Sequence, residues 1–152
     1  MSLVNIGGDL ITRPNPTCLE NGGLSYRLHL EQLAQYSVNS MDNYAGVGHH
    51  LDTRKQCQTC AVEKLEGGWF LRPTELYVAT VKELIHSKQQ FMPWVQLDPT
   101  LSTRGVTVHN AGFMERRGAQ IPFELVFSVL HMVKVYPGDV VARVFFHDVK
   151  LR

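Results

Sequence analysis

The residues best suited to chemistry lie in the last third of the chain, between residues 106 and 124. The run VTVHNAGFMERRG, residues 106–118, places His109 at the end of an expected strand and turns through Asn110 to Gly112. A small residue at such a turn lets the backbone approach a ligand closely. The same pattern is typical of an ordinary hairpin turn. The run alone therefore leaves a ligand-binding loop and a plain turn both open.

Glu124 is the single carboxylate in the apolar run IPFELVF, residues 121–127. A carboxylate among buried side chains is costly unless it has a partner, and such a site can adapt the group to act as a general base. In an alternating strand, however, Phe123, Leu125 and Phe127 share one face and Glu124 takes the other. The local pattern favours this outward-facing position.

Two cysteines and two histidines offer a possible metal site in the middle of the chain. Cys57-x-x-Cys60, with His49 and His50 upstream, has the ligand types and the ligand number of a tetrahedral zinc site. Adjacent histidines seldom both reach one metal, so we favour a polar loop with inert thiols and keep zinc as the alternative. The sequence contains no P-loop, no G-x-S-x-G and no H-E-x-x-H motif.

Length and composition predict one globular domain over residues 1–152. The chain has 152 residues, of which 44% are apolar, and a net charge of +1. Such a charge provides no broad field for extended nucleic acid or a membrane surface, and no run approaches the roughly 20 apolar residues of a membrane span. Three cysteines are an odd number and do not suggest a disulfide framework. We expect a cytoplasmic protein.

The first half of the chain is expected to hold little regular structure. Residues 1–23 are rich in Gly, Pro and Asn and predict an N-terminal arm or a series of short connections. Residues 24–30 alternate apolar and polar side chains, which predicts a strand, although Leu30, Leu33 and Ala34 also fit a helical stripe. Residues 39–68 are polar and predict a long loop or an irregular insertion.

The second half is predicted to form a series of short strands separated by turn residues. Residues 81–90 could form one or two helical turns, and YPGD at 136–139 predicts a tight turn. Strands this short and this regularly spaced indicate an all-β sandwich or barrel with little helix. The expected strands cover residues 69–71, 76–79, 94–97, 105–109, 121–127, 132–136 and 140–146.

Three motifs in one order resemble the dCTP deaminases, which share a trimeric β-fold with the dUTPases. FLRPTEL at 70–76, VHNAGF at 108–113 and VYPG at 135–138 are similar to the family patterns LRPGE, VHVTAGFID and LYPG. SYRLHL at 25–30 also looks like the family's SYDLRL strand. The resemblance implies a distorted jelly-roll of the dUTPase-like β-clip type, and a homotrimer whose nucleotide sites lie between neighbouring subunits.

The resemblance also assigns roles to individual residues. Glu124 corresponds to the glutamate that activates water for attack on cytosine without zinc, and Glu115 to the carboxylate that orients water in dUTPases. The implied function is hydrolytic deamination of a pyrimidine deoxynucleotide with Glu124 as general base. Phosphate hydrolysis with Glu115 and a magnesium ion accompanying the nucleotide ranks second. The loop around sugar and base corresponds to His109, Asn110, Ala111, Gly112 and Phe113.

Several positions depart from the family pattern. The phosphate-binding Gly-Arg-Ser-Ser segment is replaced by LDPT at 97–100, where Asp98 adds a negative charge. Arg104 lies near a second family arginine and can substitute for it, and Arg143 stands where a family glutamine would contact phosphate. The printed sequence ends directly after the last expected strand, so we expect the 49–68 loop or the N-terminal arm to enclose any site. An inactive nucleotide-binding or sequestering trimer is the alternative function.

Overall fold

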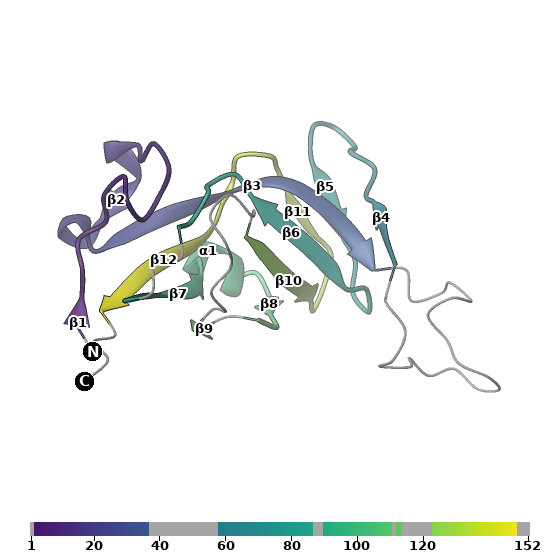
Figure 1. Cartoon of the computed structure of the whole chain (residues 1–152). Helices are drawn as coiled ribbons and strands as arrows, with labels where there is room; N and C mark the ends of the chain where they lie inside the picture. The colour runs from purple at the N-terminus through teal and green to yellow at the C-terminus, as the bar shows by residue number, and fades with distance from the viewer. Residues whose placement is uncertain (1, 37–57, 87–89, 111, 114–122, 149–152) are drawn as a thin grey trace.

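The chain forms a strongly curved β-sheet (Figure 1). The computed structural model describes residues 2–36, 58–86, 90–110, 112–113 and 123–148. The sheet has the strand order β8-β10-β6-β3-β12-β7-β9, with β1 paired to β12 and both β2 and β4 paired to β3, while β11 and β5 form a separate two-stranded sheet. The described residues therefore confirm the all-β class that the short strands predicted.

Most strands are short, and helix among the described residues is confined to single turns. The 3-10 turns are η1 (Pro16–Cys18) and η2 (Asn21–Gly23), and the α-helical turn is α1 (Pro99–Ser102). The strands are β1 (Ser2–Leu3), β2 (Leu19–Glu20), β3 (Ser25–Tyr36), β4 (Thr59–Ala61), β5 (Trp69–Leu71), β6 (Tyr77–Val81), β7 (Phe91–Leu97), β8 (Val106–Val108), β9 (Gly112–Phe113), β10 (Glu124–Val129), β11 (Val133–Val135) and β12 (Val140–Asp148).

Strand β3 joins the two halves of the sheet. Its first residues pair with β12, from Ser25 opposite Phe145 onward, and its later residues pair with β6. Tyr26, Leu28 and Leu30 are buried while the residues between them are half-buried, as the alternation predicted. A β-bulge between Leu30 and Gln32 shifts the register, and the helical alternative suggested by the Leu30–Ala34 stripe is wrong because this stretch belongs to the strand.

The two end strands of the sheet are neighbours in the sequence. Strands β8 and β9 lie at opposite ends of the strand order, yet only residues 109–111 separate them. The sheet therefore nearly closes on itself as a barrel, since its path begins and ends beside the same short connection. This connection is the turn that sequence patterns marked as a candidate ligand loop.

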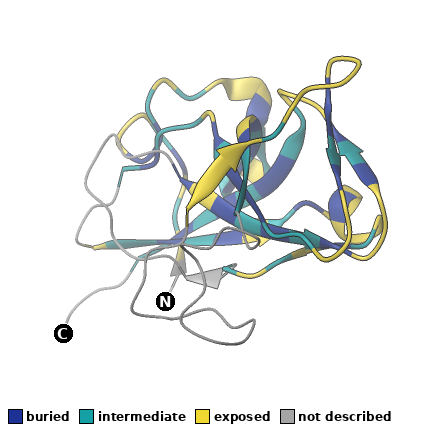
Figure 2. Ribbon diagram, turned by 90° about the vertical axis from the view of Figure 1, so that its right-hand side faces the viewer, coloured by how far each residue is buried: buried dark blue, intermediate teal, exposed yellow. Residues whose placement is uncertain are grey.

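The core lies between the curved strands and takes its side chains from most of them (Figure 2). Phe146 and Val144 on β12, Leu125 and Phe127 on β10, and Tyr77 on β6 are at most 1% exposed. Full burial of a side chain of this size stabilises the fold by roughly 1.5–3 kcal/mol. The strands that carry the candidate site are thus fixed by their inward faces, and their outward faces remain available for function.

One expectation changes once the fold is known. Residues 82–86 form bends and an isolated bridge where one or two helical turns were expected over residues 81–90, because the N-terminal arm pairs with them: Ile11 bridges Ile85, and the Thr12 amide donates to the Leu84 carbonyl over 3.1 Å. Positions 87–89 lie outside the described residues. The arm itself contributes Leu10 and Ile11 to the core.

Part of the predicted 39–68 loop can be placed. Residues 39–57 lie outside the described part of the chain, while β4 pairs with the end of β3 and Leu65 bridges Gly68. The stretch from 58 to 68 therefore includes a short strand and a tight turn. No helix among the described residues is long and apolar enough to cross a membrane.

Candidate functional site

Asn110 ties the connection between β8 and β9 to strand β10. Its side-chain Oδ1 accepts a hydrogen bond from the Val126 amide over 2.9 Å, and its Nδ2 donates to the Glu124 carbonyl over 2.9 Å. An asparagine amide can replace a peptide group in this way because it carries one acceptor and a donor pair. The backbone pairing of β8 thus continues beyond Val108 through a side chain, and the candidate loop is held against β10.

Glu124 begins β10 with its side chain exposed on the outer face of the sheet. Its cross-strand neighbour on β6 is Thr80, which in turn pairs with Gln32 on β3. Phe123 and Leu125 on either side are buried. The interpretation of Glu124 as a buried carboxylate is therefore wrong for this chain, and the outward position that strand alternation favoured is confirmed. A carboxylate in a polar cross-strand row can meet water and a ligand directly.

His109 precedes Asn110 in the connection after β8 and also contacts β10. Its amide donates to the Val126 carbonyl over 2.8 Å, and its Nε2 lies 2.7 Å from Oγ of Ser128. Ser128 also sits on β10, so the imidazole is turned along the strand away from Glu124. Cross-strand spacing keeps His109 from acting on the same atom as Glu124, and the pair with Ser128 fixes the orientation of its ring.

The remaining loop residues reach the other end of the sheet. Gly112 pairs with Val95 and Phe113 with Trp94 on β7. The structure thus brings His109 and Asn110 to β10, the strand that begins with Glu124. It places Gly112 and Phe113 on β9, beside β7. Ala111 and Glu115, the other predicted site residues of this segment, lie outside the described residues. The candidate loop therefore bridges the two end regions of the nearly closed sheet.

The LDPT segment forms the start of a helical turn. Pro99 occupies its first turn, and Asp98 is the N-cap residue, whose carbonyl accepts from the Leu101 amide over 3.0 Å. Arg104 is exposed just past this turn and donates from Nη1 to the Thr100 carbonyl over 2.8 Å. This contact is typical of an arginine that satisfies the free carbonyls at a helix end. Arg104 has no ion-pair partner in the described part of the chain.

Arg143 belongs to a compact group of two arginines and two carboxylates. It lies directly opposite Arg27 in the pairing of β12 with β3, where two like charges repel unless they are compensated. Glu20 lies between them, with 2.8 Å from Oε2 to Arg143 Nε and 3.3 Å from Oε1 to Arg27 Nε. Arg143 Nη2 is also 3.6 Å from Oδ1 of Asp98, which is 5% exposed.

This group explains how Asp98 is tolerated as a buried carboxylate. A buried carboxylate requires a compensating charge, and Arg143 on the neighbouring strand provides it. The guanidinium predicted to contact phosphate is therefore already neutralised by carboxylates. A phosphate bound by Arg143 would share the guanidinium with Glu20 and Asp98.

Of the four residues proposed as zinc ligands, only Cys60 belongs to the described part of the chain. Cys60 is exposed on β4 as a free thiol, and its Sγ donates to the Gln35 carbonyl over 3.7 Å. His49, His50 and Cys57 lie outside the described residues. Within the described ranges, no three His, Cys, Asp or Glu side chains come together as a metal site. The zinc hypothesis stays untested.

Sequence patterns alone pointed neither to Ser128 nor to Glu20. Ser128 meets His109 from 19 residues away, and Glu20 meets Arg143 across two strands. Neither residue belongs to a local motif, because strand pairing creates the contacts. The two short strands β2 and β8 would have had to be placed in register before either contact could be predicted.

Comparison with known proteins gives one family match and two similar solved structures. A dCTP deaminase-like family model matches residues 12–149. The crystal structure of 2′-deoxycytidine 5′-triphosphate deaminase from Agrobacterium tumefaciens matches with a TM-score of 0.61 at 13% identity, covering 91% of this chain and 42% of that chain. Native EIAV dUTPase matches with a TM-score of 0.45 at 11% identity, covering 57% of this chain and 81% of that chain. No curated protein sequence gives a significant match.

These likenesses differ in what they establish. The match to the Agrobacterium deaminase is a likeness of fold, since the identity is low, and this chain spans less than half of that protein's length. The family model covers most of the chain and includes the loop at 109–113, Glu124 and Arg143.

Proposed function

Because this chain belongs to the dCTP deaminase-like family, we propose that it processes a pyrimidine deoxynucleotide by hydrolytic deamination. The observation that carries the proposal is the position of Glu124. Its exposed carboxylate begins the strand to which Asn110 ties the 109–113 loop. A base and sugar held by that loop would lie beside a group able to move protons.

In the proposed step Glu124 acts as general base and then as general acid. It first carries a proton from water to N3 of cytosine while the water oxygen bonds to C4. It then carries the hydroxyl proton to the amino nitrogen. The C4–N bond breaks with its electron pair on nitrogen, ammonia leaves, and a uracil ring remains. The step uses one carboxylate for both transfers and needs no zinc ion.

The loop residues would position the nucleotide in this proposal. Asn110 uses one donor and one acceptor of its amide to bind β10, so its proposed contribution is to hold the loop. The backbone at Gly112 and Phe113 would contact sugar and base, and His109 would face the ligand from beside Ser128. Exposed Arg104, which has no ion-pair partner among the described residues, would meet a phosphate.

An exposed general base works best when water is later restricted around it, because charge interactions strengthen as solvent is excluded. We therefore place the complete site between subunits of a homotrimer, where a neighbouring subunit would cover the outer face of β10. Phosphate hydrolysis at Glu115 with a magnesium ion stays the second hydrolytic possibility.

Binding without turnover is the second candidate function, and the contacts of Arg143 favour it. This cation is engaged by Glu20 and Asp98, so the triphosphate pose expected for the family lacks one of its charges. A nucleotide could still be held by its base and sugar at the 109–113 loop. Such a protein would sequester or sense the nucleotide.

Mass spectrometry of products separates the two candidates. The purified protein is incubated with dCTP, dCDP, dCMP and dUTP, with and without magnesium. Soluble products and any molecule retained by the protein are then analysed. Conversion of a cytosine nucleotide to the corresponding uracil nucleotide with ammonia release supports deamination. Recovery of unaltered bound nucleotide from an inactive protein supports the binding function instead.

A further inference from the structure

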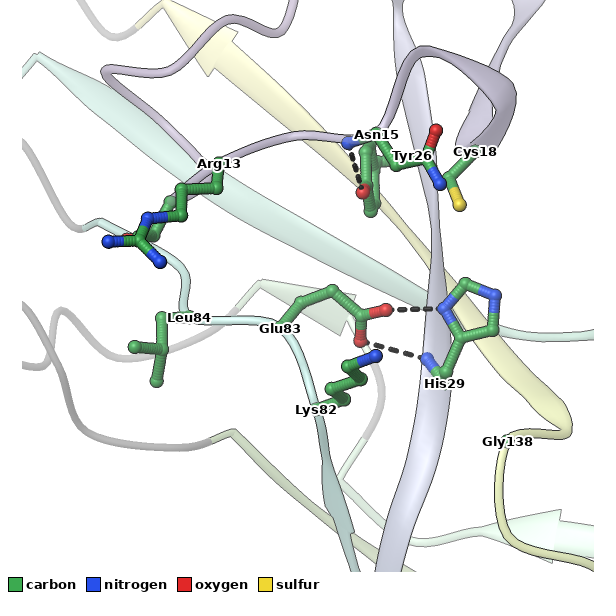
Figure 3. A pocket seen from close by; sticks show the side chains of 10 residues that line it. Arg13, Asn15, Cys18, Tyr26, His29, Lys82, Glu83, Leu84 and Gly138 are labelled. Carbon is green, nitrogen blue, oxygen red and sulfur yellow. Dashed lines mark hydrogen bonds and ion pairs between the residues drawn. The ribbon is translucent and has the colours of Figure 1, made fainter.

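A cavity of about 500 Å³ is lined by residues other than those of the loop and the strand just described (Figure 3). The N-terminal arm, the first half of β3 and the segment that follows β6 form its walls. Arg13, Tyr26, His29, Lys82 and Glu83 are among the side chains that line it. Among the described residues of its wall, none belongs to the predicted nucleotide site. A cavity of this size is within the range that holds small-molecule ligands.

Both carboxylate oxygens of Glu83 bind His29. One carboxylate oxygen contacts Nδ1 of the imidazole, and the other accepts the His29 amide over 2.8 Å. The Glu83 side chain is 8% exposed, so its charge is largely buried and committed to this partner. Figure 3 shows the carboxylate turned toward the ring and the backbone of His29. The other ring nitrogen, Nε2, has no hydrogen-bond partner within the described chain and is left for a ligand.

Two cations of the cavity wall have no carboxylate partner. Arg13 and Lys82 are both exposed, and neither forms an ion pair within the described ranges. Arg13 and Lys82 outnumber Glu83, the one carboxylate among the described residues of the wall, so the wall carries net positive charge. Positive charge from a guanidinium and an ammonium in one cavity is suited to an anion, which the guanidinium can bind through two hydrogen bonds.

The arm holds Arg13 in a constrained position. Its φ of 49° is in the left-handed region that residues other than glycine seldom adopt. The preceding residues fix this conformation, because Ile11 bridges Ile85 and the Thr12 amide donates to the Leu84 carbonyl over 3.1 Å. A strained residue that the surrounding structure enforces is often part of a binding site.

The tyrosine of the wall adds no opposing charge. Burial raises the pKa of Tyr26 above its ordinary value, and the nearby Cys18 and Glu83 raise it further, while the hydrogen bond from the Asn15 amide acts in the opposite direction. The phenol therefore stays neutral at physiological pH. Tyr26 therefore adds no negative charge to the wall, in which Glu83 is the one carboxylate among the described residues.

We propose that this cavity binds the phosphoryl group of a small phosphorylated metabolite, with Arg13 and Lys82 as its charged contacts and His29 Nε2 as a third polar contact. The volume of about 500 Å³ leaves room beyond the phosphoryl group for a sugar-sized remainder. The Glu83 carboxylate orients His29 and is a positioning residue. This function is independent of nucleotide processing at Glu124, since the two sets of residues do not overlap.

Titration calorimetry with inorganic phosphate and with ribose 5-phosphate tests the site on the full chain. Ribose 5-phosphate lacks a base, so it cannot use a pyrimidine pocket. We expect both probes to bind, with ribose 5-phosphate the tighter ligand. Arg13→Ala and Lys82→Ala should each raise the Kd about tenfold, which is the order expected for one charge-assisted contact.

Controls distinguish this site from general attraction of anions and from the nucleotide site. Arg72→Ala removes an equal charge from an exposed position outside the cavity wall and should leave both affinities within about twofold. Glu124→Gln should leave them unchanged as well, whatever it does to turnover. Absence of binding, an unaltered Kd in the Arg13→Ala/Lys82→Ala double variant, or an equal loss in Arg72→Ala would overturn the proposal.

Discussion

Arg143 Nε lies 2.8 Å from Oε2 of Glu20 in an ion pair, and the same guanidinium compensates the buried carboxylate of Asp98 at 3.6 Å. The residue predicted to hold phosphate therefore also neutralises two carboxylates within its own chain. Its structural and ligand-binding roles can be separated, because they depend on different partners and respond differently to substitution.

Replacing Arg143 with glutamine should lower the free energy of unfolding by about 1–2 kcal/mol, because Asp98 would remain buried without a charge partner. Urea denaturation followed by fluorescence measures the change. Adding Asp98→Asn to Arg143→Gln should recover most of the loss, since the unpaired charge is then gone. Equal stability of Arg143→Gln and the unsubstituted protein would show that the pair contributes nothing to the fold.

Replacing Glu20 with glutamine should instead strengthen nucleotide binding if Arg143 is a phosphate contact. The neutral amide holds the guanidinium less strongly, so a phosphate has less to displace, and we expect the Kd to fall by about threefold to tenfold. Calorimetry with a triphosphate and with the matching nucleoside identifies the origin of the gain, which should be confined to the triphosphate. An unchanged Kd for the triphosphate would place the phosphates elsewhere.

Glu124→Gln should abolish deamination, because the amide cannot accept and return the protons of the proposed step. The fold should be unaffected, since the side chain is exposed and its backbone pairing with Thr80 is retained. Ammonia release measures turnover, and circular dichroism checks the fold. Glu31→Gln, at an exposed position on β3, is the matched control and should keep full activity. Turnover that survives Glu124→Gln would remove this residue from the mechanism.

Strand periodicity in the sequence was sufficient to predict most of the β elements, because each depends on its own residues. Alternation of Tyr26, Leu28 and Leu30 predicted the start of β3, and alternation around Leu125 predicted an outward Glu124. The segment after β6 could not be predicted in this way. Its conformation is set by Ile11, far away in the sequence, which pairs with Ile85.

Local sequence patterns also could not predict the contacts between charged side chains. Arg143 and Asp98 lie 45 positions apart in numbering, and His29 and Glu83 are 54 residues apart. Their meeting depends on register between strands, which the sequence does not display locally. The resemblance to deaminases identified Arg143 and Asp98 as unusual positions, and the register of β12 with β3 and β7 explains why the two departures occur together.

Asn110→Ala should destabilise the loop more than the rest of the fold. The substitution removes an acceptor for the Val126 amide and a donor for the Glu124 carbonyl, at a cost of about 1–2 kcal/mol for the two hydrogen bonds. Hydrogen exchange should become faster at Val126 and at the neighbouring loop amides. Amides in the pairing of β12 with β7 serve as the internal control and should exchange as before. Unaltered protection at Val126 would show that the side chain does not hold the strand.

Alkaline pH should weaken the fold partly through Tyr26. Burial raises the pKa of its phenol, so the folded chain keeps the proton at a pH where the unfolded chain has begun to lose it. The unfolded state then binds fewer protons, and the free energy of unfolding falls as pH rises above about 10, while the contribution is fully present below that value.

Tyr26→Phe removes this contribution and should make the alkaline decline shallower. It should also cost about 1 kcal/mol at neutral pH, because the Asn15 amide loses its acceptor. Denaturation curves collected from pH 7 to pH 11 measure both effects, and an identical alkaline slope in the two proteins would show that Tyr26 does not control it.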